Sequence, residues 1–405
     1  MSIDASFFSD FLPYLSIPIT AALVGWGTNI LALKMTFYPI NFLGIPPYFG
    51  WQGIIPSKAK SMAEKSVDMI TTKLIRIDEQ FDRISPEQIV IEMESSLNRV
   101  SAKIVDEVME AKAPLVWKRL PKKIKQHIYD LTMRDIPIIV TEIMQDVKEH
   151  LNELFDLKAM VIEALLEDKT LLNRIFLECG REEFKFIKKS GFYFGFLFGL
   201  VQMVIWYFYQ AWWILPVAGL VVGYATNWLA LKMIFEPLKP KKIGPITFQG
   251  LFIKRQAEVA AGYAQLVTAN IITSEKIFES ILDGKHSEQL AEMIASHIRE
   301  VVDHTAADYK ELVILVKTPK QYEAMKNIAA YSFMEDFPII VRDVFDYTEE
   351  RLDIENTLRT KMASLSPEDF AGFLRPIFQE DEWKLIAVGS LLGMLAGTLQ
   401  YLLFF

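Results

Sequence analysis

The sequence predicts an all-α integral membrane protein with four transmembrane helices and two homologous helical cytoplasmic lobes, arranged as a pseudo-two-fold tandem repeat. Three observations lead to this prediction: long uncharged runs, a motif that occurs twice, and apolar residues at helical spacing between the runs. With 51% hydrophobic residues and a formal net charge of −8, the 405-residue chain is too apolar for an ordinary soluble protein. It is also too charged to lie in a membrane throughout.

Four crossings are predicted from the runs without a charged residue. About 20 apolar residues span a bilayer as a helix, and residues 11–33 and 385–405 form uncharged runs of 23 and 21 residues. The run 190–231 has 42 residues, about 63 Å of helix, so it must hold two crossings joined near "YFYQAWW". The N-terminus lacks a basic region, so we expect no cleavable signal peptide. The predicted transmembrane segments are 11–35, 189–208, 212–235 and 384–405.

Basic residues predict the orientation in the membrane. Fifteen lie near the crossing ends on the side of the two long loops, and none lies on the other side. Because positive charge is enriched in cytoplasmic loops, we expect cytoplasmic loops and both termini outside. The fifteen are Lys34, Lys58, Arg174, Arg181, Lys185, Lys188, Lys189, Lys232, Lys239, Lys241, Lys242, Lys254, Arg255, Arg375 and Lys384.

A tandem duplication is predicted from matches at an offset of 198 residues. Residues 25–39 begin "GWGTNILALKM", and residues 223–237 begin "GYATNWLALKM". The two segments are identical at ten of fifteen aligned positions. We predict a first repeat, 1–205, with a cytoplasmic helical lobe at 36–188, and a second, 209–405, with a lobe at 236–383. Because each repeat holds two crossings, a pseudo-two-fold axis along the membrane normal should relate them.

The lobes are predicted to be helical because their apolar residues step by three and four, as at Ala63, Val67, Ile70, Leu74 and Ile77. Two helix starts are marked by "SPEQ" at Ser85 and "SPED" at Ser366. In each, a capping serine precedes a proline at the first helical position.

The motif "GxxTNxLALKMxFxP", a following "QG" with a basic residue, and a closing "GxxxGxxxGxxQ" resemble the bacterial membrane-protein family known as domain of unknown function 445. Both copies match, so the resemblance covers almost the whole chain. It implies a bacterial inner-membrane protein and carries no agreed activity. The loops differ, with "IPPYFGWQG" in the first copy and the more basic "PLKPKKIGPITFQG" in the second.

Polar residues inside the motif have two interpretations. An amide facing lipid would be left unsatisfied, so Asn29 and Asn227 should bond across an interface between the repeats or to matching backbone groups. Alternatively they bind a lipid headgroup or an ion. The candidate residues for a lipid headgroup or an inter-repeat contact are Thr28, Asn29, Lys34, Thr226, Asn227, Lys232, Lys58, Lys254 and Arg255.

Lys254 and Arg255 are expected at the surface, where basic residues attract anionic lipid, although ordinary positive-inside topology also explains them. Small residues at spacing four predict close helix packing, with a gate or hinge as the alternative. The packing glycines are Gly25, Gly223, Gly191, Gly195, Gly199, Gly389, Gly393 and Gly397.

The sequence contains few groups of residues that suggest catalysis or metal binding. His297, Glu300 and His304 share a helix face, but the spacing favours a solvated face over a metal site. Cys179 has no second cysteine to pair with. We therefore predict no catalytic residue, metal or cofactor, no enzymatic activity, and, from the acidic lobes, no nucleic-acid binding.

Three functions are consistent with these features. The first is a non-enzymatic helical scaffold or docking platform, with protein partners or a second copy at the cytoplasmic lobes. The second is binding or transfer of a lipid or another amphiphile through an apolar groove between the lobes. The basic residues above would favour an anionic lipid. The third is an oligomeric channel or transporter, which four crossings without a mid-membrane ionisable residue do not favour.

Overall fold

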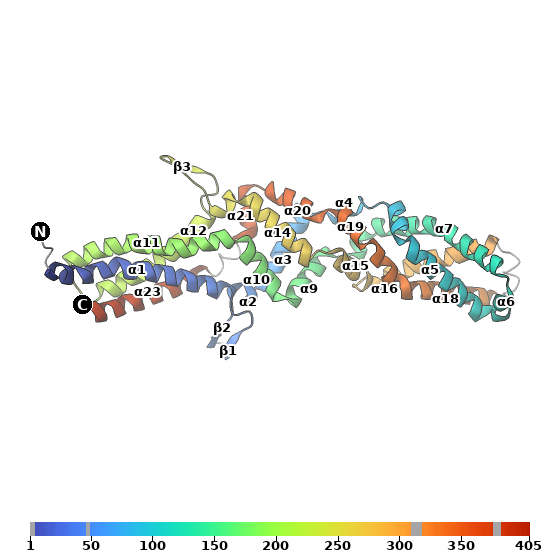
Figure 1. Ribbon diagram of the computed structural model, residues 1–405, viewed down its shortest axis with the longest axis horizontal. Coiled ribbons are helices and arrows are strands. Elements are labelled where there is room, and N and C mark those ends of the chain that lie inside the picture. The colour runs from blue at the N-terminus through green and yellow to red at the C-terminus, as the bar shows by residue number, and fades with distance from the viewer. Residues whose placement is uncertain (1–4, 46–48, 309–317, 376–381) are drawn as a thin grey trace. The chain divides into compact units, whose positions relative to one another are not determined.

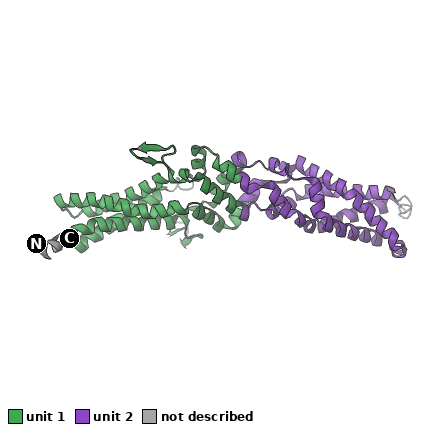
Figure 2. Ribbon diagram, turned by 45° about the horizontal axis from the view of Figure 1, so that its top comes forward, with its two compact units in different colours: residues 1–70, 162–267, 358–405 green, residues 71–161, 268–357 purple. Residues whose placement is uncertain are grey.

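The computed structural model describes residues 5–45, 49–308, 318–375 and 382–405, and it is all-α apart from two short β-hairpins (Figure 1). The chain divides into two compact units (Figure 2). Unit 1 comprises residues 1–70, 162–267 and 358–405, and unit 2 comprises residues 71–161 and 268–357. Each unit takes segments from both halves of the sequence. The division therefore does not follow the predicted repeats, which describe relatedness of sequence and not packing.

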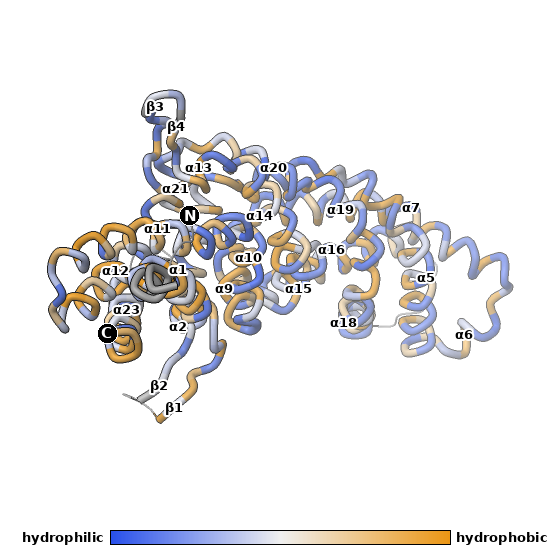
Figure 3. Tube along the Cα trace, turned by 60° about the vertical axis from the view of Figure 1, so that its left-hand side comes forward, coloured by the Kyte–Doolittle hydropathy of each residue, from blue (hydrophilic) through white to orange (hydrophobic). Residues whose placement is uncertain are grey.

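Unit 1 contains four long apolar helices at the membrane crossings that the sequence predicts. They are long and apolar enough to cross a membrane, and hydrophobic residues gather along them in Figure 3. Three helices begin before the predicted segments, because each continues into charged residues that a search for uncharged runs leaves out. The four are α1 (Ala5–Phe37), α11 (Arg181–Phe208), α12 (Ile214–Phe235) and α23 (Glu382–Phe404).

The spanning helices pack as two close pairs, α1 with α11 and α12 with α23, and α1 also contacts α12 and α23. Glycine makes this approach possible, because a Cβ on Gly25 would overlap the carbonyl oxygen of Gly191. The equivalent overlap in the other pair is between Gly223 and Gly389. The remaining glycines meet backbone in the same way: Gly195 at Ala21, Gly199 at Pro18, Gly393 at Gly219, and Gly397 at Leu215.

The rest of unit 1 consists of shorter elements that follow α1 and α12 or precede α11 and α23. The first hairpin pairs β1 with β2 and the second pairs β3 with β4, both antiparallel. Pro46, Pro47 and Tyr48 of the first loop lie outside the described residues. The elements are β1 (Leu43–Ile45), β2 (Phe49–Trp51), α2 (Ile54–Ser57), α3 (Ala59–Met69), α10 (Lys169–Cys179), β3 (Lys241–Ile243), β4 (Ile246–Phe248), α13 (Leu251–Lys254) and α21 (Pro367–Leu374). The division between the units falls within η1 (Ile70–Leu74), α9 (Leu157–Glu167), α14 (Gln256–Asn270) and α20 (Ile354–Ala363).

Unit 2 is built on four long helices, two from each half of the sequence: α5 (Pro86–Lys112), α7 (Lys122–Glu149), α16 (Ser287–Asp308) and α18 (Pro319–Val341). Helix α5 packs against α7 and α18, and α16 packs against the same two. Shorter elements complete the unit: α4 (Ile77–Phe81), α6 (Pro114–Arg119), α8 (Leu151–Leu154), α15 (Ser274–Leu282), η2 (Arg342–Val344) and α19 (Phe345–Leu352).

The two predicted helix starts are confirmed. The Ser85 hydroxyl accepts a hydrogen bond from the backbone N–H of Gln88 at the start of α5. The Ser366 hydroxyl accepts one from Asp369 at the start of α21. In both helices proline takes the first position, where its missing N–H costs no helical hydrogen bond.

Replacing Gly191 by alanine should destabilise the α1–α11 pair. The added Cβ would overlap the carbonyl oxygen of Gly25 and crowd the Asn29 amide, and such overpacking costs about 1–3 kcal/mol. Gly27→Ala is the matched control, because a Cβ there meets no atom within 4 Å. Thermal unfolding in detergent should show a lower midpoint for Gly191→Ala alone. Equal midpoints for the two variants would contradict the close pairing.

Candidate functional site

The motif's asparagines tie together the two crossings of the same half. The Asn29 amide donates a 2.6 Å hydrogen bond to the Ile187 carbonyl, and the Asn227 amide donates one of 3.3 Å to the Leu385 carbonyl. These are the matching backbone groups that the sequence analysis allowed, in place of a bond across an interface between the repeats. Both side chains are buried, and Asn29 Oδ1 has no hydrogen-bond partner among the described residues.

The threonines beside them bond to their own helices. Thr28 donates to the Gly25 carbonyl at 3.2 Å and Thr226 to the Val222 carbonyl at 2.8 Å. Both are buried, so these hydroxyls are satisfied one turn back and do not face a ligand.

The "QG" of each copy closes the base of a hairpin. Gln52 donates to the Ile40 carbonyl at 2.7 Å, and Gln249 donates to the Leu238 carbonyl at 3.3 Å. The following glycines, Gly53 and Gly250, donate backbone hydrogen bonds of 2.9 Å to Pro39 and Pro237 and pack on the end of the preceding spanning helix. This motif therefore fixes how the chain leaves each spanning helix.

Lys34 and Lys232, in the last turns of α1 and α12, are exposed. Lys232 lies 3.8 Å from the Glu236 carboxylate and 4.8 Å from the Trp228 ring centroid. It borders a polar cavity of about 190 Å³, where Arg375 also pairs with Glu236 at 2.9 Å. Lys34 is exposed at the end of α1, and Lys58 is half-buried.

Arg255 is not the surface residue that the sequence analysis expects. Its guanidinium forms two hydrogen bonds, 2.8 and 3.0 Å, to Glu183, whose side chain is 1% exposed, and one of 2.8 Å to Glu258. Burial lowers the pKa of Arg255, but the bonds to Glu258 and Glu183 outweigh this effect and raise it. Arg255 thus neutralises a buried acid, whereas Lys254 is exposed.

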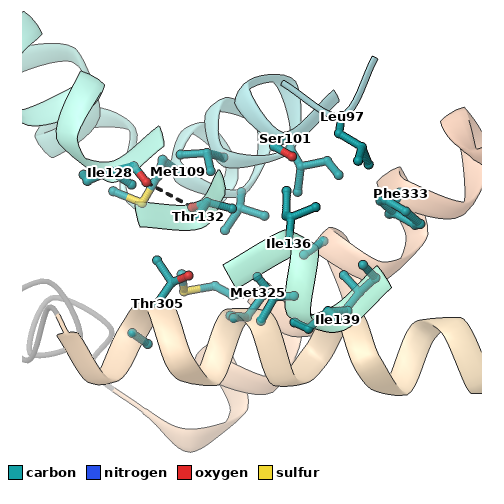
Figure 4. A pocket seen from close by; sticks show the side chains of 18 of the residues that line it. Leu97, Ser101, Met109, Ile128, Thr132, Ile136, Ile139, Thr305, Met325 and Phe333 are labelled. Carbon is teal, nitrogen blue, oxygen red and sulfur yellow. Dashed lines mark hydrogen bonds between the residues drawn. The ribbon is translucent and has the colours of Figure 1, made fainter. Parts of the chain in front are cut away.

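Unit 2 contains a partly open apolar cavity of about 160 Å³ between its four long helices. Leu97 of α5, Ile136 of α7 and Met325 of α18 are among the side chains that converge on it (Figure 4). A second cavity of about 90 Å³ shares Leu97 and Phe333 with the first, so the two adjoin.

Few polar groups line the larger cavity. Thr132 is satisfied by the Ile128 carbonyl at 3.0 Å, and the Tyr322 hydroxyl by Asp303 at 2.7 Å. Thr305 Oγ1 is buried and has no hydrogen-bond partner in the described part of the chain. Lys112, at the end of α5, is exposed and forms no ion pair with any described residue.

Three side chains of types that can ligate a metal ion lie together on α7 and α16 in the same unit. Glu142, His297 and Glu300 place ligand atoms within 4.8 Å of one another. The imidazole of His297 also bonds to Asp146 at 2.8 Å. His304, which the sequence grouped with His297 and Glu300, is exposed and lies outside this cluster. Sequence spacing missed Glu142 and Asp146 because they come from a helix about 150 residues earlier.

Known proteins resemble parts of this chain. It is 31% identical over 119 residues to a UPF0754 protein of Alkalihalophilus pseudofirmus, covering 27% of this chain and 31% of that protein. A UPF0754 membrane protein of Staphylococcus epidermidis is 25% identical over 161 residues, 33% of this chain and 43% of the relative. One of Halalkalibacterium halodurans is 36% identical over 80 residues, 19% and 21% of the two chains.

The chain is similar to bacterial UPF0754 membrane proteins. This similarity and the four apolar helices identify it as a membrane protein. The matches span less than half of each of these relatives, and UPF0754 is an uncharacterised family. No family model matches the chain, so the resemblance to domain of unknown function 445 stays a prediction. No solved structure matches it.

Replacing Arg255 by methionine should destabilise unit 1, because it leaves the Glu183 carboxylate buried without a partner. Breaking a buried pair costs roughly 3–5 kcal/mol, and the partial exposure of Arg255 places this variant at the lower end. The double variant Glu183→Leu, Arg255→Met should recover most of the loss, since no charge is left buried. Lys254→Met is the control. Chemical unfolding in detergent measures all three, and a double variant as unstable as Arg255→Met would show that the pair is not the cause.

Proposed function

We propose that the protein is a membrane-anchored, non-enzymatic binding protein for an amphiphile, with the apolar cavity of unit 2 as its site. The observation that carries the proposal is this cavity of about 160 Å³, lined by helices from both halves of the chain. Cavities of about 150 Å³ lined by aliphatic side chains stay dry and bind small apolar molecules.

The energetics favour an occupant. An empty apolar cavity costs stability, because the side chains that line it lack contact partners. Hydrocarbon that fills it restores dispersion contacts and removes apolar surface from water. The volume suits a ring or several methylene groups, so the cavity would take part of an alkyl chain and not a whole phospholipid.

Two groups favour a polar end on the occupant. Thr305 brings a buried hydroxyl without a partner among the described residues, and a buried hydroxyl left unpaired is costly. Lys112 supplies an exposed ammonium beside the same cavity. A carboxylate or phosphate head on a medium-length chain fits this pair, whereas a neutral hydrocarbon would leave both unused.

Replacing Ala329 by leucine should weaken binding of decanoate. Ala329 is 2% exposed and lines the cavity, so the larger side chain occupies the space that the alkyl chain needs. We expect at least a tenfold rise in Kd, measured by equilibrium dialysis of radiolabelled decanoate against full-length protein in nanodiscs, with empty nanodiscs subtracted. The control Ala307→Leu changes an exposed alanine outside the cavity lining.

Unchanged affinity in a folded Ala329→Leu protein would place the amphiphile elsewhere. One alternative is the polar cavity beside Lys232, which suits a lipid headgroup, anionic or zwitterionic, because Lys232 and Arg375 face Glu236 and Glu382 there. If wild-type protein takes up no decanoate, the scaffold or docking platform, with a protein partner or a second copy, becomes the better proposal. Nothing in the described cavities favours an oligomeric channel.

We also infer that the chain is a tandem duplication of the kind found in domain of unknown function 445, set in the bacterial inner membrane. The paired amide bonds of Asn29 and Asn227 and the paired hairpin bases of Gln52 and Gln249 support this inference. In the proposed topology the long loops are cytoplasmic and both termini lie outside.

Single-cysteine labelling tests this topology. An impermeant maleimide should label Gln210→Cys in intact cells and should label Glu110→Cys only after lysis, since residue 210 lies in the turn between α11 and α12 and residue 110 in α5. Burial raises the pKa of the native Cys179 thiol to about 12, so at pH 7.5 it holds almost no reactive thiolate. The parent protein should therefore stay unlabelled until it is denatured. Labelling of residue 110 in intact cells would show that the proposed orientation is wrong.

A further inference from the structure

We propose that His297, Glu142 and Glu300 form a binding site for a first-row divalent transition-metal ion, with Zn²⁺ the best fit. The three side chains come from two helices of unit 2, Glu142 from α7 and the other two from α16. The proposal does not depend on amphiphile binding, because it rests on a different set of residues.

The spacing suits an ion that draws its ligands slightly inward. His297 Nδ1 lies 3.8 Å from a Glu142 oxygen and 3.9 Å from a Glu300 oxygen, both beyond hydrogen-bond distance. Two ligands on a tetrahedral ion with bonds of 2.0–2.1 Å lie about 3.3 Å apart. The Glu142 and Glu300 side chains are 51% and 60% exposed, so both can rotate inward by the half ångström required.

The imidazole is oriented as a metal-bound histidine is. Its Nε2 lies 2.8 Å from an Asp146 oxygen. Because a carboxylate only accepts, Nε2–H donates to it, and in the neutral imidazole the lone pair is then on Nδ1. A carboxylate behind a histidine fixes its tautomer and makes the other nitrogen a better ligand. Asp146 would therefore be a positioning residue for His297.

The unpaired Nδ1 of His297 also indicates a ligand. His297 Nδ1 is buried and has no hydrogen-bond partner among the residues that the structure describes, and the side chain is only 13% exposed. A nitrogen lone pair beside two carboxylates is unfavourable, and a metal cation bound between them would relieve the repulsion. Imidazole and carboxylate donors together suit Zn²⁺ and its first-row neighbours, with water completing the coordination.

An ion at this position would clamp α7 to α16. These two helices come from different halves of the sequence and both line the apolar cavity. The metal–ligand bonds would hold α7 and α16 together more strongly than their side-chain packing does, and would so fix this wall of the cavity.

Isothermal titration of Zn²⁺ into chelator-treated, full-length protein in detergent tests the proposal. We expect one ion per chain, and Co²⁺ in its place should give a visible absorption band that reports on its ligands. His297→Ala, and the double variant Glu142→Gln, Glu300→Gln, should each weaken binding at least 100-fold. Asp146→Asn should weaken it about 10- to 100-fold, as such partners of a metal ligand do.

His304→Ala is the matched control, because His304 is exposed on the same helix outside the cluster. It should bind Zn²⁺ as wild type does. Circular dichroism checks that each variant is helical, and if His297→Ala does not fold, the double glutamine variant decides, since both glutamates are exposed. Failure of wild type to bind, or equal affinity in wild type and the glutamine variant, would overturn the proposal.

Discussion

Close backbone contact between helices inside the membrane is the constraint on which the other features of unit 1 depend. Lipid is as apolar as leucine, so burying apolar side chains does not by itself drive one spanning helix onto another. Glycine removes the side chain that would keep the backbones apart, and van der Waals contact and hydrogen bonds then supply the attraction. The overlap that a Cβ on Gly25 would make with Gly191 shows how little space remains. The asparagine amides lie at the same contacts, where the facing carbonyls are within reach.

This constraint explains which features could be predicted from sequence. Uncharged runs, glycines at spacing four and capping serines are local signals, and they predicted the spanning helices and two helix starts correctly. The hydrogen-bond partners of Asn29 and Gln52 could not be predicted. Both side chains bond to backbone carbonyls, and every residue has one, so the sequence does not mark the partner. Arg255 was misplaced for a related reason. Its partner Glu183 comes 72 residues earlier, and nothing local marks that acid as buried.

The candidate sites in unit 2 were beyond sequence analysis for a different reason. His297 and His304 occupy one helix face, but only the facing helix decides which of them meets Glu142. Spacing along a helix reveals which residues share a face and not what that face contacts. The cavity has the same origin, because its wall needs α5 and α7 from the first half together with α16 and α18 from the second. Neither half of the chain holds enough of the lining to form it alone.

The hairpins have a practical consequence. The β3–β4 hairpin is held to the protein at its base, by Gln249 and Gly250, and the Gly244 between its strands has a φ of +62° with no neighbouring atom within 4 Å of an added Cβ. A segment attached at its base and open at its tip tolerates added chain, because insertions in exposed turns disturb little packing. This turn is therefore a suitable place to insert an epitope tag or a fluorescent label in living cells while both termini are left unaltered.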